Sequence, residues 1–216
     1  MPPESQKVSI REKIGYSLGD SAANFVFMTM ILFQLNYYTD TLGIAAGVAG
    51  TLLLVGRLWD AFFDPLMGII ADRTNTRWGK FRPWVLLAGI PFGVVFWLVY
   101  VVPNVGPQGK VVYAALTYVL LMILYSDNNT PYSALMGVIT PDSSERTNVA
   151  RYRFVAAIFG QFIIQTFALP MVDKFGGLAN PKAWGTAMAV MLAGKGVPVR
   201  RIVGIRGITA GSSPGA

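Results

Sequence analysis

The feature that most constrains this sequence is a series of apolar segments long enough to cross a lipid bilayer. A helix needs about 20 apolar residues to span roughly 30 Å of hydrocarbon. Five segments reach this length, namely 14–37, 42–71, 84–102, 111–139 and 154–172. A sixth, 183–193, has only 11 residues. The segments are too long for strands and do not alternate with a period of two. We therefore predict an all-α membrane protein with five full spans and part of a sixth.

The composition agrees with a chain that folds in lipid. Only 13% of its 216 residues are charged, against about a quarter in an ordinary soluble domain. The sequence contains no Cys and no His, which removes thiolate metal ligands, the usual zinc ligand and the commonest general base. We therefore expect neither an enzyme nor a cofactor.

The basic residues indicate how the chain is oriented. Ten of them lie on one side of the predicted spans: Lys7, Arg11, Lys13, Arg73, Arg77, Lys80, Arg82, Arg146, Arg151 and Arg153. Three lie on the other side: Lys110, Lys174 and Lys182. By the positive-inside rule this asymmetry predicts a cytoplasmic N-terminus in the plasma membrane, which for a bacterium is the inner membrane. It also accounts for most of the net charge of +7, so lipid rather than nucleic acid is the expected partner.

The same pattern divides the chain into three parts. We expect a cytoplasmic N-terminal segment at 1–13, a transmembrane bundle at 14–193 and a basic, Gly-rich tail at 194–216. The leader contains Glu4 and Glu12, so it does not resemble a cleavable signal peptide. The sixth span loses its apolar pattern before it is long enough to cross. We interpret the tail as a frameshift or premature end of a longer gene, and the alternative is a native flexible tail.

Asp60 and Asp64 lie within an apolar segment, where an ionised group costs roughly 2.5–3.5 kcal/mol. A spacing of four residues places both carboxylates on one helix face, about 6 Å apart along the axis. Two such carboxylates can hold a small hard cation, or one of them can carry a proton. Arg57 lies on the same face, and the alternative is a structural salt bridge between Arg57 and Asp60.

Two further acidic residues interrupt apolar segments. Asp20 is either an interfacial residue of a tilted helix or a hydrogen-bond acceptor for a hydroxyl-rich ligand. Asp127 begins the polar cluster DNNTP at 127–131. Polar clusters and helix breaks near the midplane are typical of transporter substrate sites, although such side chains can also simply join helices.

Three motifs resemble one known family. RLWDAFFDPLMG at 57–68 is similar to the second-helix signature of the glycoside–pentoside–hexuronide:cation symporters, which are sugar carriers of the major facilitator superfamily. RWGKFRPW at 77–84 and YYTD at 37–40 match that family's second loop and the end of its first helix. The resemblance covers about residues 14–189. It implies a major-facilitator-type N-terminal six-helix bundle, a C-terminal half that this sequence does not contain, and H⁺- or Na⁺-coupled sugar symport.

The resemblance also implies roles for individual residues. Those that match its cation site are Asp60, Asp64 and Ser126. Those that match its sugar site are Asp20, Asn129 and Arg153. Those that match the cytoplasmic gating motif are Gly68, Asp72 and Arg73.

Three positions depart from the pattern of melibiose-type carriers, and a fourth bears on the coupling ion. Gly19 replaces a Lys, Asn129 a sugar-binding Asp and Ser133 an aromatic platform, so the sugar is left open. Phe63 stands where sodium-using carriers have Asn, and the loss of an oxygen ligand favours a proton. Two alternatives remain at this point: a carrier of amphiphilic lipids, and a non-transporting remnant or half-transporter that needs a partner.

Overall fold

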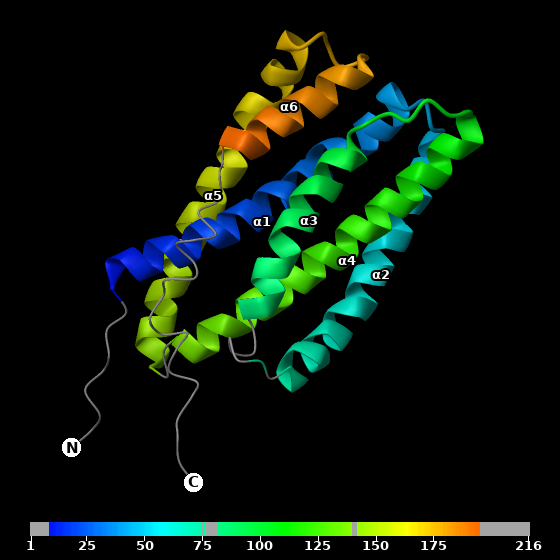
Figure 1. Ribbon diagram of the computed structural model, residues 1–216. Coiled ribbons are helices and arrows are strands. Elements are labelled where there is room, and N and C mark those ends of the chain that lie inside the picture. The colour runs from blue at the N-terminus through cyan, green and yellow to red at the C-terminus, as the bar shows by residue number, and fades with distance from the viewer. Residues whose placement is uncertain (1–8, 75, 77–81, 140–141, 195–216) are drawn as a thin grey trace, which may run out of the picture.

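The chain folds into a bundle of α-helices (Figure 1). The computed structural model describes residues 9–74, 76, 82–139 and 142–194. Its helices are α1 (Ile10–Asn36), α2 (Ala46–Arg73), α3 (Arg82–Val99), α4 (Pro107–Ile139), α5 (Ser143–Lys174) and α6 (Pro181–Gly194). A π-helical turn, η1 (Tyr37–Thr41), continues α1. The described residues contain no strand, and the predicted all-α class is confirmed.

Four helical segments are long and apolar enough to cross a membrane. They are Lys13–Thr41, Ala46–Arg73, Pro107–Ala134 and Ser143–Lys174. The apolar part of α3, Leu87–Val99, is shorter, and α6 has 14 residues. The count of five full spans and a partial sixth therefore stays a prediction.

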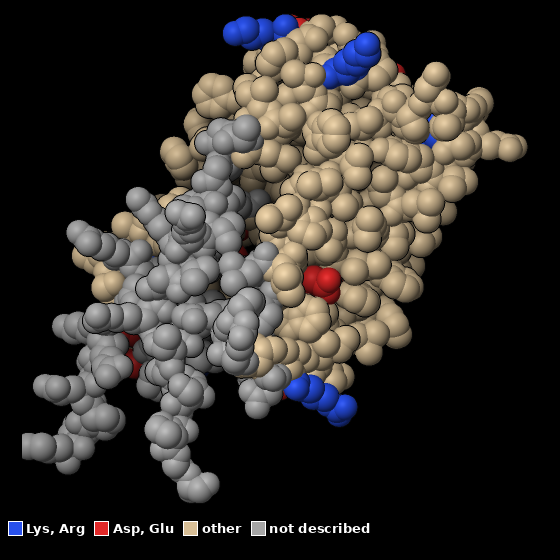
Figure 2. Space-filling view, viewed as in Figure 1, with Lys and Arg blue, Asp and Glu red and all other residues tan. Residues whose placement is uncertain are grey.

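The outer surface of the bundle suits lipid. Figure 2 shows a face made mostly of uncharged side chains, with Lys and Arg gathered towards its two ends. Large apolar side chains point outward on several helices, including Ile90 at 76% exposure and Leu116 at 67%. A soluble monomer rarely exposes so much contiguous apolar surface, whereas a membrane protein places it against acyl chains.

Helix α5 begins eleven residues before the predicted span at 154. The sequence between the predicted spans 111–139 and 154–172 is therefore helical from Ser143 onward. The Asp142 side chain accepts a hydrogen bond from the Ser144 backbone N–H at 2.9 Å, which caps the helix. A hydropathy pattern detects only the apolar part of a helix, so it missed the polar first three turns.

The predicted domain limits at the chain ends fall mostly outside the described residues. Helix α1 begins at Ile10, so the helix starts before the predicted boundary at 13. The first residue of the predicted tail, Gly194, ends α6, and residues 195–216 lie outside the described residues.

The helices pack in two groups. Helix α1 packs along α5, with α6 also against α5, and α4 packs between α2 and α3. At Gly56 the α2 backbone approaches α4 so closely that a Cβ atom there would overlap the Tyr118 ring. This close approach brings the polar face of α2 against the middle of α4.

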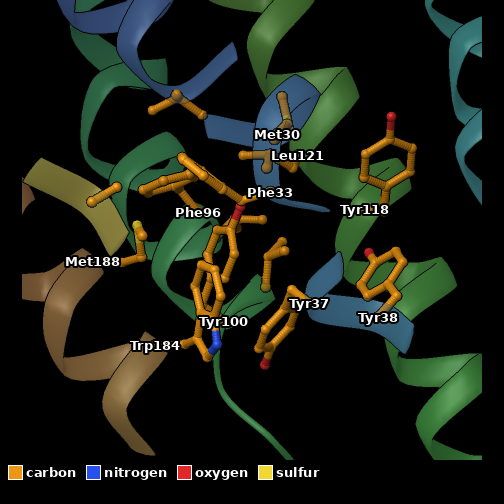
Figure 3. Packing of buried hydrophobic residues seen from close by; sticks show 14 of the residues in the cluster. Met30, Phe33, Tyr37, Tyr38, Phe96, Tyr100, Tyr118, Leu121, Trp184 and Met188 are labelled. Atoms are coloured by element: carbon orange, nitrogen blue, oxygen red, sulfur yellow. The ribbon is translucent and has the colours of Figure 1, made fainter. Parts of the chain in front are cut away.

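Aromatic side chains lock one end of the bundle. Figure 3 shows Tyr37, Tyr100 and Trp184 gathered where η1, α3 and α6 meet. The rings of Tyr100 and Trp184 stack with centroids 5.9 Å apart. Tyr37 lies 17 residues after Asp20, or roughly 25 Å along the helix axis. The aromatic cluster therefore holds the bundle together far from the buried charges.

Candidate functional site

The two carboxylates of α2 meet one hydroxyl of α4. Ser126 Oγ lies 3.0 Å from Asp60 Oδ1 and 2.6 Å from Asp64 Oδ1. Thr130, one turn further along α4, places its Oγ1 3.5 Å from the same oxygen of Asp64. The Ser126 side chain is fully buried, whereas Asp60 and Asp64 are half-buried. The structure thus brings together all three residues that match the family's cation site.

This oxygen cluster suits a small hard cation or a proton. Carboxylate and hydroxyl oxygens are ligands for hard ions, and neither thiolate nor imidazole nitrogen is present in the chain. Among the described residues, no group of three or more acidic, His or Cys side chains is placed to hold a metal ion. Two carboxylates and the neighbouring hydroxyls therefore form a site for a single small cation or a proton.

Arg57 does not form the salt bridge that we weighed for it. Its guanidinium carbon lies 4.7 Å from the centre of the Phe27 ring on α1, in a cation–π arrangement. Within the described part of the chain, the ion pairs are Lys13–Glu145 and Arg153–Asp20. Arg57 therefore links α2 to α1 and leaves the carboxylates of Asp60 and Asp64 to the hydroxyls of α4.

Asp20 and Arg153 form a second polar centre between α1 and α5. Arg153 Nη2 lies 2.6 Å from Asp20 Oδ1. Asn24, one turn further along α1, donates to the other carboxylate oxygen at 3.1 Å. Asp20 is only 4% exposed, so its charge is compensated inside the bundle. Asp20 therefore faces the interior of the bundle and not its outer surface.

Tyr16 and Tyr132 extend this centre to α4, and the sequence analysis missed both. Their rings stack with centroids 4.7 Å apart. The Tyr16 hydroxyl donates to the Tyr132 carbonyl at 2.8 Å, and the Tyr132 hydroxyl donates back to the Tyr16 carbonyl. One signal could have found Tyr16, because it precedes Asp20 by four residues and so shares its helix face.

The remaining polar residues of α4 stay outside these two centres. Asn129 is half-buried and makes no hydrogen bond to Asp20 or Arg153 among the described residues. Asp127 is also half-buried. The buried Asn128 Oδ1 atom has no hydrogen-bond partner in the part of the chain that the structure describes. Helix α4 runs on through Pro131, so the polar cluster at 127–131 does not end the helix.

The residues that match the gating motif lie at the end of α2. Gly68 faces α4, where a Cβ atom would come within 3.9 Å of Thr130 Cγ2. Asp72 and Arg73 are exposed in the last turn of α2. Most of the basic loop that follows, residues 75 and 77–81, lies outside the described residues.

Comparison with known proteins identifies the fold and the family. Residues 15–194 match the family model described as MFS/sugar transport protein. The chain is 45% identical over 188 residues to the inner membrane symporter YicJ of Escherichia coli K12, covering 87% of this chain and 41% of that protein. It is 43% identical over 185 residues to the putative glycoside/cation symporter YagG of the same organism, covering 86% and 40%.

A third relative is named for the sugar that it transports. The isoprimeverose transporter of Lactiplantibacillus pentosus is 40% identical over 181 residues, covering 84% of this chain and 38% of the relative. The chain thus spans about two-fifths of the length of these relatives. It is a multi-pass membrane protein of the glycoside–pentoside–hexuronide:cation symporter family, within the major facilitator superfamily.

Proposed function

We propose that this chain carries the cation site and one side of the sugar site of a cation-coupled sugar symporter. The observation that carries the proposal is the position of Ser126 Oγ between Asp60 Oδ1 and Asp64 Oδ1, at 3.0 and 2.6 Å. Two carboxylates converge there inside a lipid-length helix, and a visiting H⁺ or Na⁺ would relieve their mutual repulsion.

The coupling follows from the shared helices. Helix α4 supplies Ser126 to the cation site and Tyr132 to the neighbourhood of Asp20 and Arg153. A cation that draws α2 and α4 together would favour one arrangement of α1 and α5. By linkage, a sugar that prefers this arrangement must tighten cation binding by the same factor.

The sugar would bind at the charged pair of α1 and α5. A carboxylate and a guanidinium side by side offer acceptors and donors that match the hydroxyls of a pyranoside. Asn129 would add a neutral amide from α4. Isoprimeverose and a methyl glucuronide are suitable probes for the neutral and the acidic members of the glycoside, pentoside and hexuronide class.

We also propose an orientation and a further set of helices. The basic residues favour a cytoplasmic N-terminus in the bacterial inner membrane, with Gly68, Asp72 and Arg73 at a cytoplasmic gate. Exposed apolar residues on α2 and α5, such as Phe62 and Phe159, would pack against a C-terminal half like the rest of the longer relatives.

The test is a chimera in which this chain replaces the matching part of YicJ. We expect uptake of isoprimeverose or methyl glucuronide into inverted or right-side-out vesicles to depend on an imposed Na⁺ or proton gradient. Asp60→Asn and Asp64→Asn should each abolish gradient-driven uptake, whereas Asp173→Asn, at an exposed position on α5, should not. Uptake that keeps its gradient dependence in Asp64→Asn would defeat the assignment of the cation site.

A further inference from the structure

Tyr16 is buried beside the charged pair of α1 and α5. It is 1% exposed and lies one helical turn before Asp20. Its aromatic ring lies 5.5 Å from the guanidinium carbon of Arg153. A tyrosine hydroxyl in such a place needs partners, because a buried polar group without a hydrogen bond is costly.

The Arg153 guanidinium is held at both of its terminal nitrogens. Nη2 donates to Asp20 Oδ1 at 2.6 Å, and Nη1 donates to the Tyr16 hydroxyl at 3.4 Å. The two acceptors are one turn apart on α1. A guanidinium held at only one nitrogen could still rotate about its Nε–Cζ bond. With both terminal nitrogens bound, the planar guanidinium of Arg153 cannot rotate in this way.

The direction of the Tyr16 hydroxyl follows from its other contact. A hydroxyl has one hydrogen, and here that hydrogen is donated to the Tyr132 carbonyl at 2.8 Å. The lone pairs of the oxygen are then free to accept from Arg153. The Tyr132 ring also stacks on the Tyr16 ring, so the backbone carbonyl and the ring of Tyr132 on α4 hold Tyr16 in this orientation.

We propose that Tyr16 is a positioning residue of the sugar site, which holds Arg153 in the orientation that meets the sugar. This inference rests on the proposed function, and it adds a residue that neither the cation site nor the charged pair contains. A guanidinium that is already fixed loses less rotational freedom when the sugar binds. Tyr16 also ties Arg153 on α5 to the helix that carries Ser126.

The chain offers a matched pair of variants for the test. Tyr16→Phe removes the acceptor for Arg153 Nη1 and the donor to the Tyr132 carbonyl. Tyr132→Phe also removes one buried hydroxyl, but it leaves Arg153 bound to Tyr16. Both variants keep the stacked rings, so a loss that reflects packing alone should be equal in the two.

The first measurement needs no sugar. In the purified chain, labelled with ¹⁵N-arginine and placed in lipid nanodiscs, the Arg153 signal is assigned by its loss in Arg153→Lys. We expect two resolved Nη signals in the wild type and in Tyr132→Phe, because rotation is slow. Tyr16→Phe should merge them. A merged signal in the wild type, or two resolved signals in Tyr16→Phe, would overturn the proposal.

The second measurement uses the YicJ chimera and isoprimeverose uptake. We expect Tyr16→Phe to raise KM about 3- to 10-fold, which is the worth of one or two hydrogen bonds, with little change in Vmax or in cation dependence. The KM of Tyr132→Phe should stay close to the wild-type value. Equal KM changes in both variants would assign Tyr16 to packing alone. A wild-type chimera that transports none of the sugar probes would defeat the proposed function, while the Arg153 signals would still show whether Tyr16 holds that side chain.

Discussion

Ser126 Oγ on α4 lies 2.6 Å from Asp64 Oδ1 on α2, which is the distance of a strong charge-assisted hydrogen bond. The same hydroxyl lies within 3.0 Å of Asp60, yet it has only one hydrogen to donate. One of the two contacts therefore joins a lone pair of Ser126 to a carboxylate oxygen. Two oxygen atoms that face each other with lone pairs repel. A proton on one carboxylate, or a cation among the three oxygens, would remove this repulsion.

We expect Ser126→Ala to weaken cation binding and Ser126→Thr to preserve it. The alanine lacks the third oxygen, and loss of a hydrogen-bond partner for a charged group costs about 1.5–3 kcal/mol, or roughly 10- to 100-fold in affinity. Isothermal titration calorimetry of Na⁺ into the purified chain in nanodiscs would measure this change in sodium affinity. Thr51→Ala, an exposed hydroxyl that bonds only the Gly47 carbonyl, is the control. Equal sodium affinity in Ser126→Ala and wild type would contradict the role of Ser126.

The cation site should bind Na⁺ more tightly as pH rises. We expect protons and Na⁺ to compete for the same carboxylate oxygens of Asp60 and Asp64, so that acid weakens sodium binding and sodium binding releases protons. Calorimetry in buffers of different ionisation enthalpy counts the protons released. We expect at most about one proton to be released per ion, and fewer in Asp64→Asn, which lacks one of the two competing carboxylates. Sodium affinity that does not vary with pH would show that protons do not share this site.

Helices and charged pairs were predictable from the sequence to different extents. The long apolar segments predict the helices well, because every backbone polar group in lipid must be bonded within its own helix. The spacing of Asp60 and Asp64 predicts their common face for the same reason. Ser126 lies more than sixty residues further along the chain, and only the family resemblance placed it beside them.

Contacts that depend on how two helices cross were not predictable. Periodicity places Tyr16 on the face of Asp20, but it does not show that this face meets Tyr132 of α4. The partner of Arg57 was also open, since Phe27 belongs to another helix. Both contacts depend on how the helices pack against each other, and the pattern of one sequence segment does not contain that information.

We expect Arg153→Gln to destabilise the fold more than the double variant Arg153→Gln/Asp20→Asn. Removal of the arginine alone leaves the Asp20 carboxylate buried without its counter-charge, which typically costs about 3–5 kcal/mol. Removal of both charges leaves two neutral amides that can bond each other. Thermal unfolding in one detergent, with exposed Lys174→Gln as the control, would measure the difference. Strictly additive effects of the two substitutions would show that the pair is not coupled.

We expect Gly56→Ala to separate α2 from α4 and to lower stability by about 1–3 kcal/mol. The added methyl group would overlap the Tyr118 ring, which is only 2% exposed. Gly50→Ala, on the same helix, meets nothing within 4 Å, and there the alanine should be neutral or stabilising because it favours helix. Thermal unfolding of both variants measures the contrast. Because Asp60 and Asp64 follow Gly56 on α2, Gly56→Ala should also weaken sodium binding by moving them away from Ser126. If Gly56→Ala were as stable as Gly50→Ala and kept its sodium affinity, the close approach of α2 and α4 would not be needed to assemble the site.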